Sequence, residues 1–304
     1  MGRLMHDKYG PSLLRARHDE VAVTDEATTE LSSFKSRSIN FKIAFWDPEV
    51  NGLRYMKTLI YNLAAGLSDE NWKRLRRIGN RTVGDPFTIT YNGELVCMDY
   101  LRSVLELDFI ARDVELDGAR VLEIGAGYGR TGHTLLSNHD LREYHIIDLP
   151  QSLKLSQAYL RTVLDDEQYA KVRFTSVADV DERYADTEFD LTVNISSFSE
   201  MKPETVDEYL KLIDQRSRYF YIRDAVGKYL DGSLNGNTEQ PEVIKMALSA
   251  GKLRDVIDIH DSHDVESHGP AFVDAYRPGS GWTCVANAWA PPWSHYWQAL
   301  YGKK

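Results

Sequence analysis

Three glycines and two acidic residues, spaced along a strand–turn–helix pattern, are the clearest candidates for chemistry in this 304-residue sequence. Glu123 lies inside an apolar run, and Asp148 ends the next such run. Gly125, Gly127 and Gly129 follow the first run directly. Glycine lets a ligand approach the main chain closely, and the N–H groups that open the next helix then face that ligand. The pattern therefore predicts a nucleotide-like ligand at the end of a strand.

The same residues discriminate between two nucleotide ligands. Residues 127–132 form a GxGxxG string, and Asp148 lies 19 residues after Gly129, which suits the ribose of NAD and of S-adenosylmethionine alike. Glu123 favours the methyl donor, because NAD folds keep this strand apolar whereas a methionine ammonium needs an acid. Two further features favour the methyl donor. The GxGxxG string of an NAD site would begin at Gly127, two residues later than the end of the strand requires. About 120 mostly helical residues also precede the motif, which is usual for methyltransferases. The alternative is a glycine-rich turn that binds no ligand.

From Asp117 onward, β-rich runs alternate with helical segments, which indicates a parallel sheet covered by helices on both faces. The predicted fold class is α/β, a seven-stranded, mostly parallel Rossmann-like sheet with an antiparallel edge strand. The final two strands are expected to form an antiparallel hairpin at that edge. Strands are predicted at 120–124, 144–148, 172–177, 189–195, 219–223, 256–260 and 282–288, and helices near 130–138, 151–165 and 203–216.

Residues 1–114 are predicted to form a helical N-terminal region that caps an α/β domain over residues 115–304. Apolar residues recur at helical spacing within 53–64 and within 100–111, and Ser68 suits the N-cap of another helix. Residues 1–40 are polar and poorly periodic, as in a mobile arm or a short capping helix. The helical region is also a candidate surface for a homodimer.

Three strings carry a resemblance to a known family. They are LEIGAGYGR at 122–130, YHIIDLP at 144–150 and SSFSEM at 196–201. The first resembles motif I of the class I S-adenosylmethionine-dependent methyltransferases, and residues 115–290 fit the strand order of that fold. Together the strings resemble the sugar O-methyltransferase family of polysaccharide and glycosylated-antibiotic gene clusters, over about residues 80–225.

The resemblance implies S-adenosyl-L-methionine as the cofactor. Gly125 and Gly127 are expected to admit its methionine half, and Glu123 to bind the ammonium group. Asp148 is expected to accept the two ribose hydroxyls, although a carboxylate there also suits a helix cap, and Leu149 is expected to pack on the adenine.

Four further residues are candidates for binding the cofactor. Asp179 follows the third strand, where it suits either the adenine amino group or the start of a helix, and Asn194 lies near the end of the fourth. On the helix before the first strand, Arg102 suits a bidentate grip on the methionine carboxylate. Tyr100 lies on the same helix, and residues just before the first strand often cover the cofactor in this superfamily. The alternatives are that Arg102 is a solvated helix residue and that Tyr100 is a core anchor.

Methyl transfer to a hydroxyl requires a group that accepts the hydroxyl proton. Glu200 is the first candidate because it lies in the family-like string just past the fourth strand; the alternative is a helix-start carboxylate. Asp224, after the fifth strand, is the second candidate. His263 is the third, from a run at 258–268 with three histidines and three aspartates, which otherwise suits a polar loop. No metal site is predicted, because the run has no zinc spacing, although some sugar methyltransferases use a magnesium ion held by carboxylates.

Composition restricts the partners. With 46 acidic and 36 basic residues the net charge is −10, which disfavours nucleic acid. No apolar run approaches the roughly 18 residues of a membrane span, and no apolar leader is visible at the N-terminus, so we expect a cytoplasmic protein.

The expected substrate is a saccharide or small molecule, and a tryptophan- and tyrosine-rich stretch at 282–301 suits a saccharide platform or core packing. The rivals are a dinucleotide-dependent oxidoreductase, a methyltransferase acting on nitrogen or a carboxylate, and a non-catalytic partner protein.

Overall fold

The computed structural model describes residues 46–229 and 241–304. The polar stretch at 1–40 lies outside these residues. The chain divides into two units, residues 1–59 and 60–304, and the division falls within helix α4 (Pro48–Ala65). In the first unit the Tyr55 hydroxyl donates to the Trp46 carbonyl at 2.6 Å, and Arg54 lies over the Trp46 ring. The domain boundary expected near residue 115 stays a prediction.

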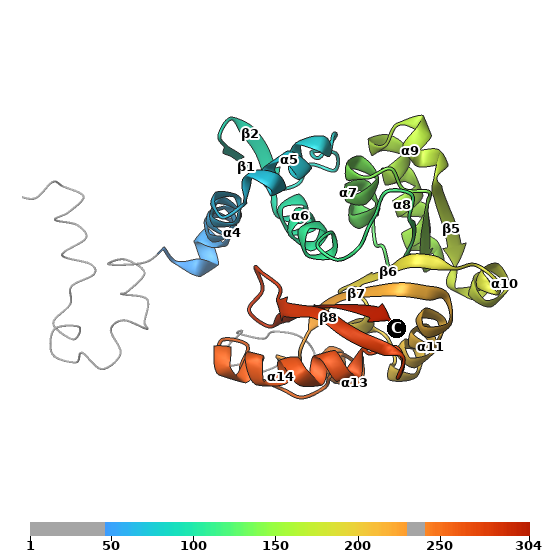
Figure 1. Ribbon diagram of the computed structural model, residues 1–304. Helices are drawn as coiled ribbons and strands as arrows, with labels where there is room; N and C mark the ends of the chain where they lie inside the picture. Colours follow the sequence, from blue (N-terminus) through green and yellow to red (C-terminus); the bar gives the residue numbers. More distant parts are fainter. Residues whose placement is uncertain (1–45, 230–240) are drawn as a thin grey trace, which may run out of the picture. The chain divides into compact units, whose positions relative to one another are not determined.

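The second unit contains a seven-stranded sheet in the order β5-β4-β3-β6-β7-β9-β8 (Figure 1). β3 to β7 pair in parallel, whereas β9 runs antiparallel to both of its neighbours. The predicted fold class is therefore confirmed. The strands are β3 (Arg120–Ile124), β4 (Glu143–Asp148), β5 (Val172–Ser176), β6 (Phe189–Ile195), β7 (Ser217–Ala225), β8 (Trp282–Trp289) and β9 (Tyr296–Lys303).

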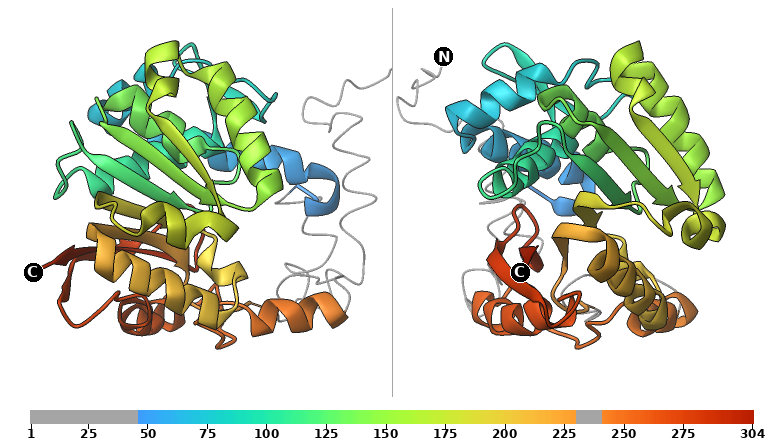
Figure 2. Two further views of the ribbon diagram at one scale, coloured as in Figure 1. Left: turned by 90° about the vertical axis from the view of Figure 1, so that its right-hand side faces the viewer. Right: turned by 45° about the vertical axis from the view of Figure 1, so that its right-hand side comes forward.

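Two hydrophobic cores lie on opposite faces of this sheet. Val121 and Tyr221 belong to one core, whereas their neighbours Leu122 and Ile222 belong to the other, because successive strand residues point to opposite faces. Both faces are therefore buried under helices, as the two views of Figure 2 show. The longer helices are α6 (Met98–Ile110), α7 (Arg130–Asn138), α8 (Pro150–Val163), α11 (Pro203–Arg216) and α14 (Ser262–Ala275).

Shorter elements complete the described part of the unit. Ser68 caps α5 by accepting a hydrogen bond from the Asn71 N–H at 3.2 Å, as its position in the sequence predicts. A hairpin was not predicted at 88–97; its strands turn at Asn92 and Gly93, both at positive φ, as a two-residue hairpin turn requires. The remaining elements are α5 (Asp69–Arg77), β1 (Thr88–Tyr91), β2 (Glu94–Cys97), α9 (Asp166–Ala170), η1 (Val177–Asp179), α10 (Val180–Tyr184), η2 (Phe198–Glu200) and α13 (Pro241–Ser249).

The edge of the sheet differs from the prediction. Residues 256–260 form only a bridge between Val256 and Lys228, and the last hairpin is β8 with β9. No strand was predicted at Tyr296–Lys303, where the aromatic residues suit either a saccharide platform or core packing. Aromatic side chains also suit a strand with both faces covered, and Leu300 and Tyr301 are fully buried there. Among the described residues, no helix is long and apolar enough to cross a membrane.

Candidate functional site

The turn between β3 and α7 requires glycine at two positions for different reasons. Gly125 has a φ of +77°, and a Cβ built on it would lie 2.3 Å from the Ser197 hydroxyl oxygen. Gly127 has a φ of +57° but no atom within 4 Å of such a Cβ. Both glycines are thus needed for their backbone conformation. Gly125 is also needed for close packing against Ser197, whereas Gly127 leaves open space beside the turn.

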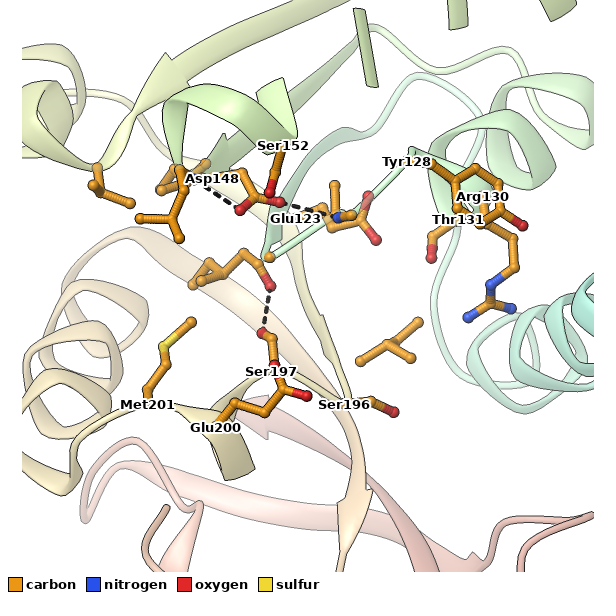
Figure 3. Close-up of a pocket in the computed structure, with 18 of the residues that line it drawn as sticks. Glu123, Tyr128, Arg130, Thr131, Asp148, Ser152, Ser196, Ser197, Glu200 and Met201 are labelled. Carbon is orange, nitrogen blue, oxygen red and sulfur yellow. Dashed lines mark hydrogen bonds between the residues drawn. The ribbon is translucent and has the colours of Figure 1, made fainter. Parts of the chain in front are cut away.

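This turn borders a cavity of about 660 Å³ at the carboxyl ends of β3, β4 and β6. Its size is typical of a site for a small molecule or cofactor. In Figure 3, Ser196, Ser197 and Glu200 lie across the cavity from Asp148 and Ser152. The polar lining residues are Asp99, Arg102, Glu123, Tyr128, Arg130, Thr131, Asp148, Ser152, Ser196, Ser197, Glu200, Thr205 and Tyr209.

The Asp148 carboxylate is oriented by two backbone donors. Its Oδ2 accepts from the Gly127 N–H at 3.0 Å, and its Oδ1 accepts from the Leu149 N–H at 2.7 Å. The remaining lone pairs of the carboxylate can accept hydrogen bonds from hydroxyl groups of a ligand in the cavity. Leu149 is 60% exposed and lines the cavity beside this carboxylate.

Glu123 is a buried acid that lines the cavity. It is 1% exposed, and its Oε2 accepts from the Tyr144 hydroxyl at 2.7 Å. Burial raises the pKa of Glu123 to about 7, against the opposing effect of hydrogen bonds from Tyr144 and Thr131. No ion pair to Glu123 forms within the described part of the chain. The site thus holds a carboxylate that a cationic ligand group would stabilise.

Three arginines surround one buried carboxylate beside the cavity; Arg102, Glu106, Arg130 and Arg223 are called the arginine cluster below. Glu106 lies 2.7 Å from Arg130, 3.4 Å from Arg223 and 4.0 Å from Arg102. Burial alone would favour the neutral acid, but the three guanidinium groups lower the pKa of Glu106 overall. Burial, together with the charges of Arg130 and Arg223, lowers the pKa of Arg102 to about 10, although Glu106 opposes this shift. The cluster therefore holds more cations than carboxylates.

The structure brings seven of the predicted site residues to the cavity. These are Arg102, Glu123, Gly125, Gly127, Asp148, Leu149 and Glu200. They come from α6, from the end of β3 and the turn after it, from the end of β4 and the residue after it, and from η2, so four separate segments meet at one place.

Two other predicted residues lie behind the cavity wall. The Asn194 amide donates to the Ile124 carbonyl at 2.9 Å and to the Ser197 hydroxyl at 2.6 Å. Asp224 is fully buried, and its Oδ2 accepts from the Ser199 N–H at 2.9 Å. Both side chains thus hold the segment after β6 rather than line the cavity.

Three predicted residues are placed elsewhere. Tyr100 is buried, and its hydroxyl lies 2.6 Å from His133 Nδ1 and 2.5 Å from the Tyr159 hydroxyl. Asp179 is exposed at the start of α10, and it is the neighbouring Val177 that lines the cavity. His263 is exposed in the first turn of α14, outside the cavity lining, because residues 262–275 form a helix instead of a loop over the site.

The sequence reasoning also missed residues that the fold brings to the site. Ser196 was only one of several polar candidates after the fourth strand, yet it lines the cavity at a φ of +60°, which is rare for a non-glycine residue. Tyr128 and Arg130 lie inside the glycine string, where the pattern of glycines drew attention away from them. Glu106 carries no local signal beyond its four-residue spacing from Arg102.

The histidine- and aspartate-rich run was considered as a metal site. Among residues 46–229 and 241–304, no three His, Cys, Asp or Glu side chains gather as ligands for a metal ion. The run divides between a turn and α14, where Asp258 and Asp261 accept hydrogen bonds from nearby backbone N–H groups.

No family model matches the chain, and the search of curated proteins returns no match. Solved structures are similar to parts of this chain at low sequence identity. The methyltransferase domain of bacterial CtHen1 is 12% identical, with a TM-score of 0.46 over 66% of this chain and 97% of that one. The pyocyanin biosynthetic protein PhzM is 13% identical, with a TM-score of 0.44 over 85% and 68%.

Magnesium protoporphyrin IX methyltransferase from Synechocystis PCC 6803, solved with bound SAH, is 13% identical, with a TM-score of 0.42 over 78% of this chain and 95% of that one. In this chain, the antiparallel strand β9 lies between the fifth parallel strand, β7, and the edge strand β8. The second unit thus has a Rossmann-like fold built on a seven-stranded, mostly parallel sheet.

Proposed function

We propose that this protein is an S-adenosyl-L-methionine-dependent O-methyltransferase that acts on a sugar hydroxyl in a glycan, a nucleotide sugar or a glycosylated metabolite. The observation that carries the proposal is the pairing of two carboxylates in one cavity. Asp148 is oriented by backbone donors at one side, and Glu123 is buried there with no cationic partner in the part of the chain that the structure describes. A ribose and a methionine ammonium are the groups that such a pair suits.

The residues present fit the cofactor. Glu123 would hold the ammonium group, and the cation would remove the cost of ionising a buried acid. Asp148 would accept the ribose hydroxyls, the open space at Gly127 would admit the main body of the ligand, and Leu149 would contact the adenine. When bound, the cofactor supplies a methyl group on a sulfonium, which a hydroxyl oxygen attacks in line.

Glu200 is the proposed general base. It lies in η2 just after β6, lines the cavity and is exposed, so its carboxylate is accessible to a substrate hydroxyl. Asp224 acts as a positioning residue, because its carboxylate holds the Ser199 N–H next to Glu200. His263 is not retained, because it lies outside the cavity lining.

The choice of a sugar hydroxyl depends on the family-like string at 196–201. Ser196, Ser197, Glu200 and Met201 line the cavity, whereas Phe198 is fully buried in the core. The string therefore combines cavity residues with one structural anchor, as a segment that shapes a substrate site would.

A binding experiment tests the cofactor first. Thermal denaturation is followed with S-adenosylhomocysteine and, in parallel, with NADH. At 100 times its dissociation constant, a ligand adds about 2.7 kcal/mol to the free energy of unfolding. A shift with S-adenosylhomocysteine alone supports the proposal and leads to turnover assays with sugar acceptors. A shift with NADH alone, or with neither ligand, contradicts it.

A further inference from the structure

Buried side-chain atoms without a hydrogen-bond partner gather beside the cavity. Eight such nitrogen or oxygen atoms occur in the described residues, and four belong to Arg102, Glu106, Arg223 and His295. Native proteins satisfy most buried polar groups, so a local concentration of unsatisfied polar atoms, two of them guanidinium donors of Arg102 and Arg223, marks a place where a ligand completes the bonding. We infer that the acceptor substrate carries an anionic group, a carboxylate or a phosphate, that binds between Arg102 and Arg223. This inference rests on the proposed function.

Arg223 is the clearest of these groups. The residue is 1% exposed, and its Nη1 has no hydrogen-bond partner within residues 46–229 and 241–304. Its Nη2 reaches the Ala290 and Pro291 carbonyls only at 3.4 and 3.5 Å, and its Nε lies 3.4 Å from Glu106. Charge-assisted hydrogen bonds are ordinarily 2.7–2.9 Å long. None of these contacts of the guanidinium is as short as a charge-assisted hydrogen bond. The group can therefore still donate hydrogen bonds to an oxyanion.

Glu106 does not neutralise the arginine cluster. Its Oε2 is engaged by Arg130 at 2.7 Å, and its Oε1 lies 3.4 Å or more from Arg223 and Arg102. Three guanidinium groups therefore share one carboxylate, in a chain whose net charge is −10. The nearby Asp99 carboxylate is engaged by the Tyr128 hydroxyl at 3.1 Å. The charge that remains uncompensated is concentrated on Arg102 and Arg223.

The position of this charge points to the acceptor and not to the cofactor. Arg223 lies near the carboxyl end of β7, which is two strands from β3 and its glycine turn in the sheet order. Neighbouring strands are about 4.8 Å apart, so the Arg223 backbone lies roughly 10 Å from β3. Arg102 lines the same cavity, which makes the cluster continuous with the site. An anion held by both arginines would lie past the end of β6, on the side where Ser196 and Glu200 are placed.

Aromatic rings adjoin the two arginines. The Arg223 guanidinium lies 4.7 Å from the centroid of the Tyr296 ring, and Arg102 lies 5.9 Å from that of Trp293. Trp293 and His295 come from the segment between β8 and β9, and the His295 ring packs 5.0 Å from Tyr296. Aromatic faces next to cationic donors suit a sugar ring that bears a carboxylate or phosphate.

Calorimetric titration of the full chain saturated with S-adenosylhomocysteine tests the inference. Glucuronate and glucose 1-phosphate are the anionic probes, and methyl glucoside is the neutral probe. We expect at least one anionic probe to bind tenfold or more tightly than the neutral one, and the better probe identifies carboxylate or phosphate. Equal binding of all three probes, or binding of neither anion, overturns the inference.

Three variants locate the effect. Arg223→Met should reduce the preference for the anionic probe at least tenfold while leaving the affinity for S-adenosylhomocysteine within threefold, and Arg223→Lys should retain part of the preference. Arg218→Met, on the same strand with its side chain 72% exposed, is the matched control and should change nothing. An unchanged preference in Arg223→Met overturns the inference alone, whereas failure of the wild type to bind S-adenosylhomocysteine overturns the proposed function with it.

Discussion

The Oδ2 atom of Asp148 accepts a hydrogen bond from the backbone N–H of Gly127 at 3.0 Å, which ties the end of β4 to the glycine turn after β3. The other oxygen is engaged by the Leu149 N–H at 2.7 Å. The carboxylate that would bind the ribose thus also fixes the backbone of the turn. If Asp148 binds the ribose as proposed, ligand binding and turn geometry are coupled through one side chain.

Asp148→Asn should weaken binding of S-adenosylhomocysteine at least tenfold. An amide presents one oxygen and one NH2 group, so one of the two backbone N–H groups would face a donor in place of an acceptor. The measurement is calorimetric titration of the purified variant. Asp179→Asn is the control, because Asp179 is exposed and outside the cavity lining, and it should stay within twofold of the wild type. Equal losses in the two variants would contradict the assignment of the ribose to Asp148.

Gly125→Ala should abolish measurable ligand binding and lower the melting temperature more than Gly118→Ala does. Both glycines have a φ of +77°, so both substitutions incur the same backbone strain of about 1–2 kcal/mol. Only at position 125 does the new Cβ meet another atom, the Ser197 hydroxyl oxygen at 2.3 Å. Thermal denaturation with and without S-adenosylhomocysteine separates the two effects. Similar behaviour of the two variants would contradict a close approach at Gly125.

Binding of S-adenosylhomocysteine should weaken about tenfold between pH 8 and pH 6. Burial raises the pKa of Glu123 to about 7, so the carboxylate that pairs with the ligand ammonium is largely protonated at pH 6. Glu123→Gln should bind weakly and without this dependence. The measurement is a series of titrations across this pH range, and a flat profile in the wild type would count against Glu123 as the ammonium partner.

The ligand-free protein should lose stability as pH rises from 4.5 to 7. The folded-state pKa of Glu123, about 7, exceeds the ordinary value of 4.5, so the folded state binds more protons than the unfolded state within this window. The free energy of unfolding should fall by up to about 3 kcal/mol across it, relative to Glu123→Gln. Urea denaturation of the two proteins at pH 5 and pH 8 measures the difference, and parallel pH profiles would exclude the effect.

Glu200→Gln should lower kcat by roughly 10²–10⁴ while leaving cofactor affinity unchanged, because a general base contributes to the transition state and not to cofactor binding. Asp224→Asn should also reduce turnover, but with a change in KM, because Asp224 holds the backbone next to Glu200 and does not line the cavity. Turnover with an accepted sugar and binding of S-adenosylhomocysteine are measured together. Full activity of Glu200→Gln would remove Glu200 from the proposed mechanism.

Local patterns were sufficient for most of the fold. The predicted helices at 130–138 and 203–216 have the observed bounds, and five parallel strands agree to within two residues at each end. The glycine turn with Glu123 and Asp148 was also predictable, because these residues lie at fixed spacing from strand ends. Hydrophobic periodicity and residue spacing predict these features because helices, strands and turns depend mainly on residues that are close along the chain. In the edge hairpin, the strand at 282–288 was predicted but its partner Tyr296–Lys303 was not, because aromatic residues suit a buried strand and a surface platform equally well.

The arginine cluster depended on tertiary structure alone. Glu106 lies on α6, Arg130 on α7 and Arg223 on β7, and no pattern in the sequence relates residues so far apart. Conversely, the histidine-rich run around His263 had the composition of a chemical site, yet α14 holds His263 outside the cavity. Composition specifies which groups a segment can offer, but only the packing of helices on the sheet determines which of them meet. The sequence by itself thus determined the glycine turn that suits a cofactor. The tertiary structure determined which charged side chains lie beside that turn.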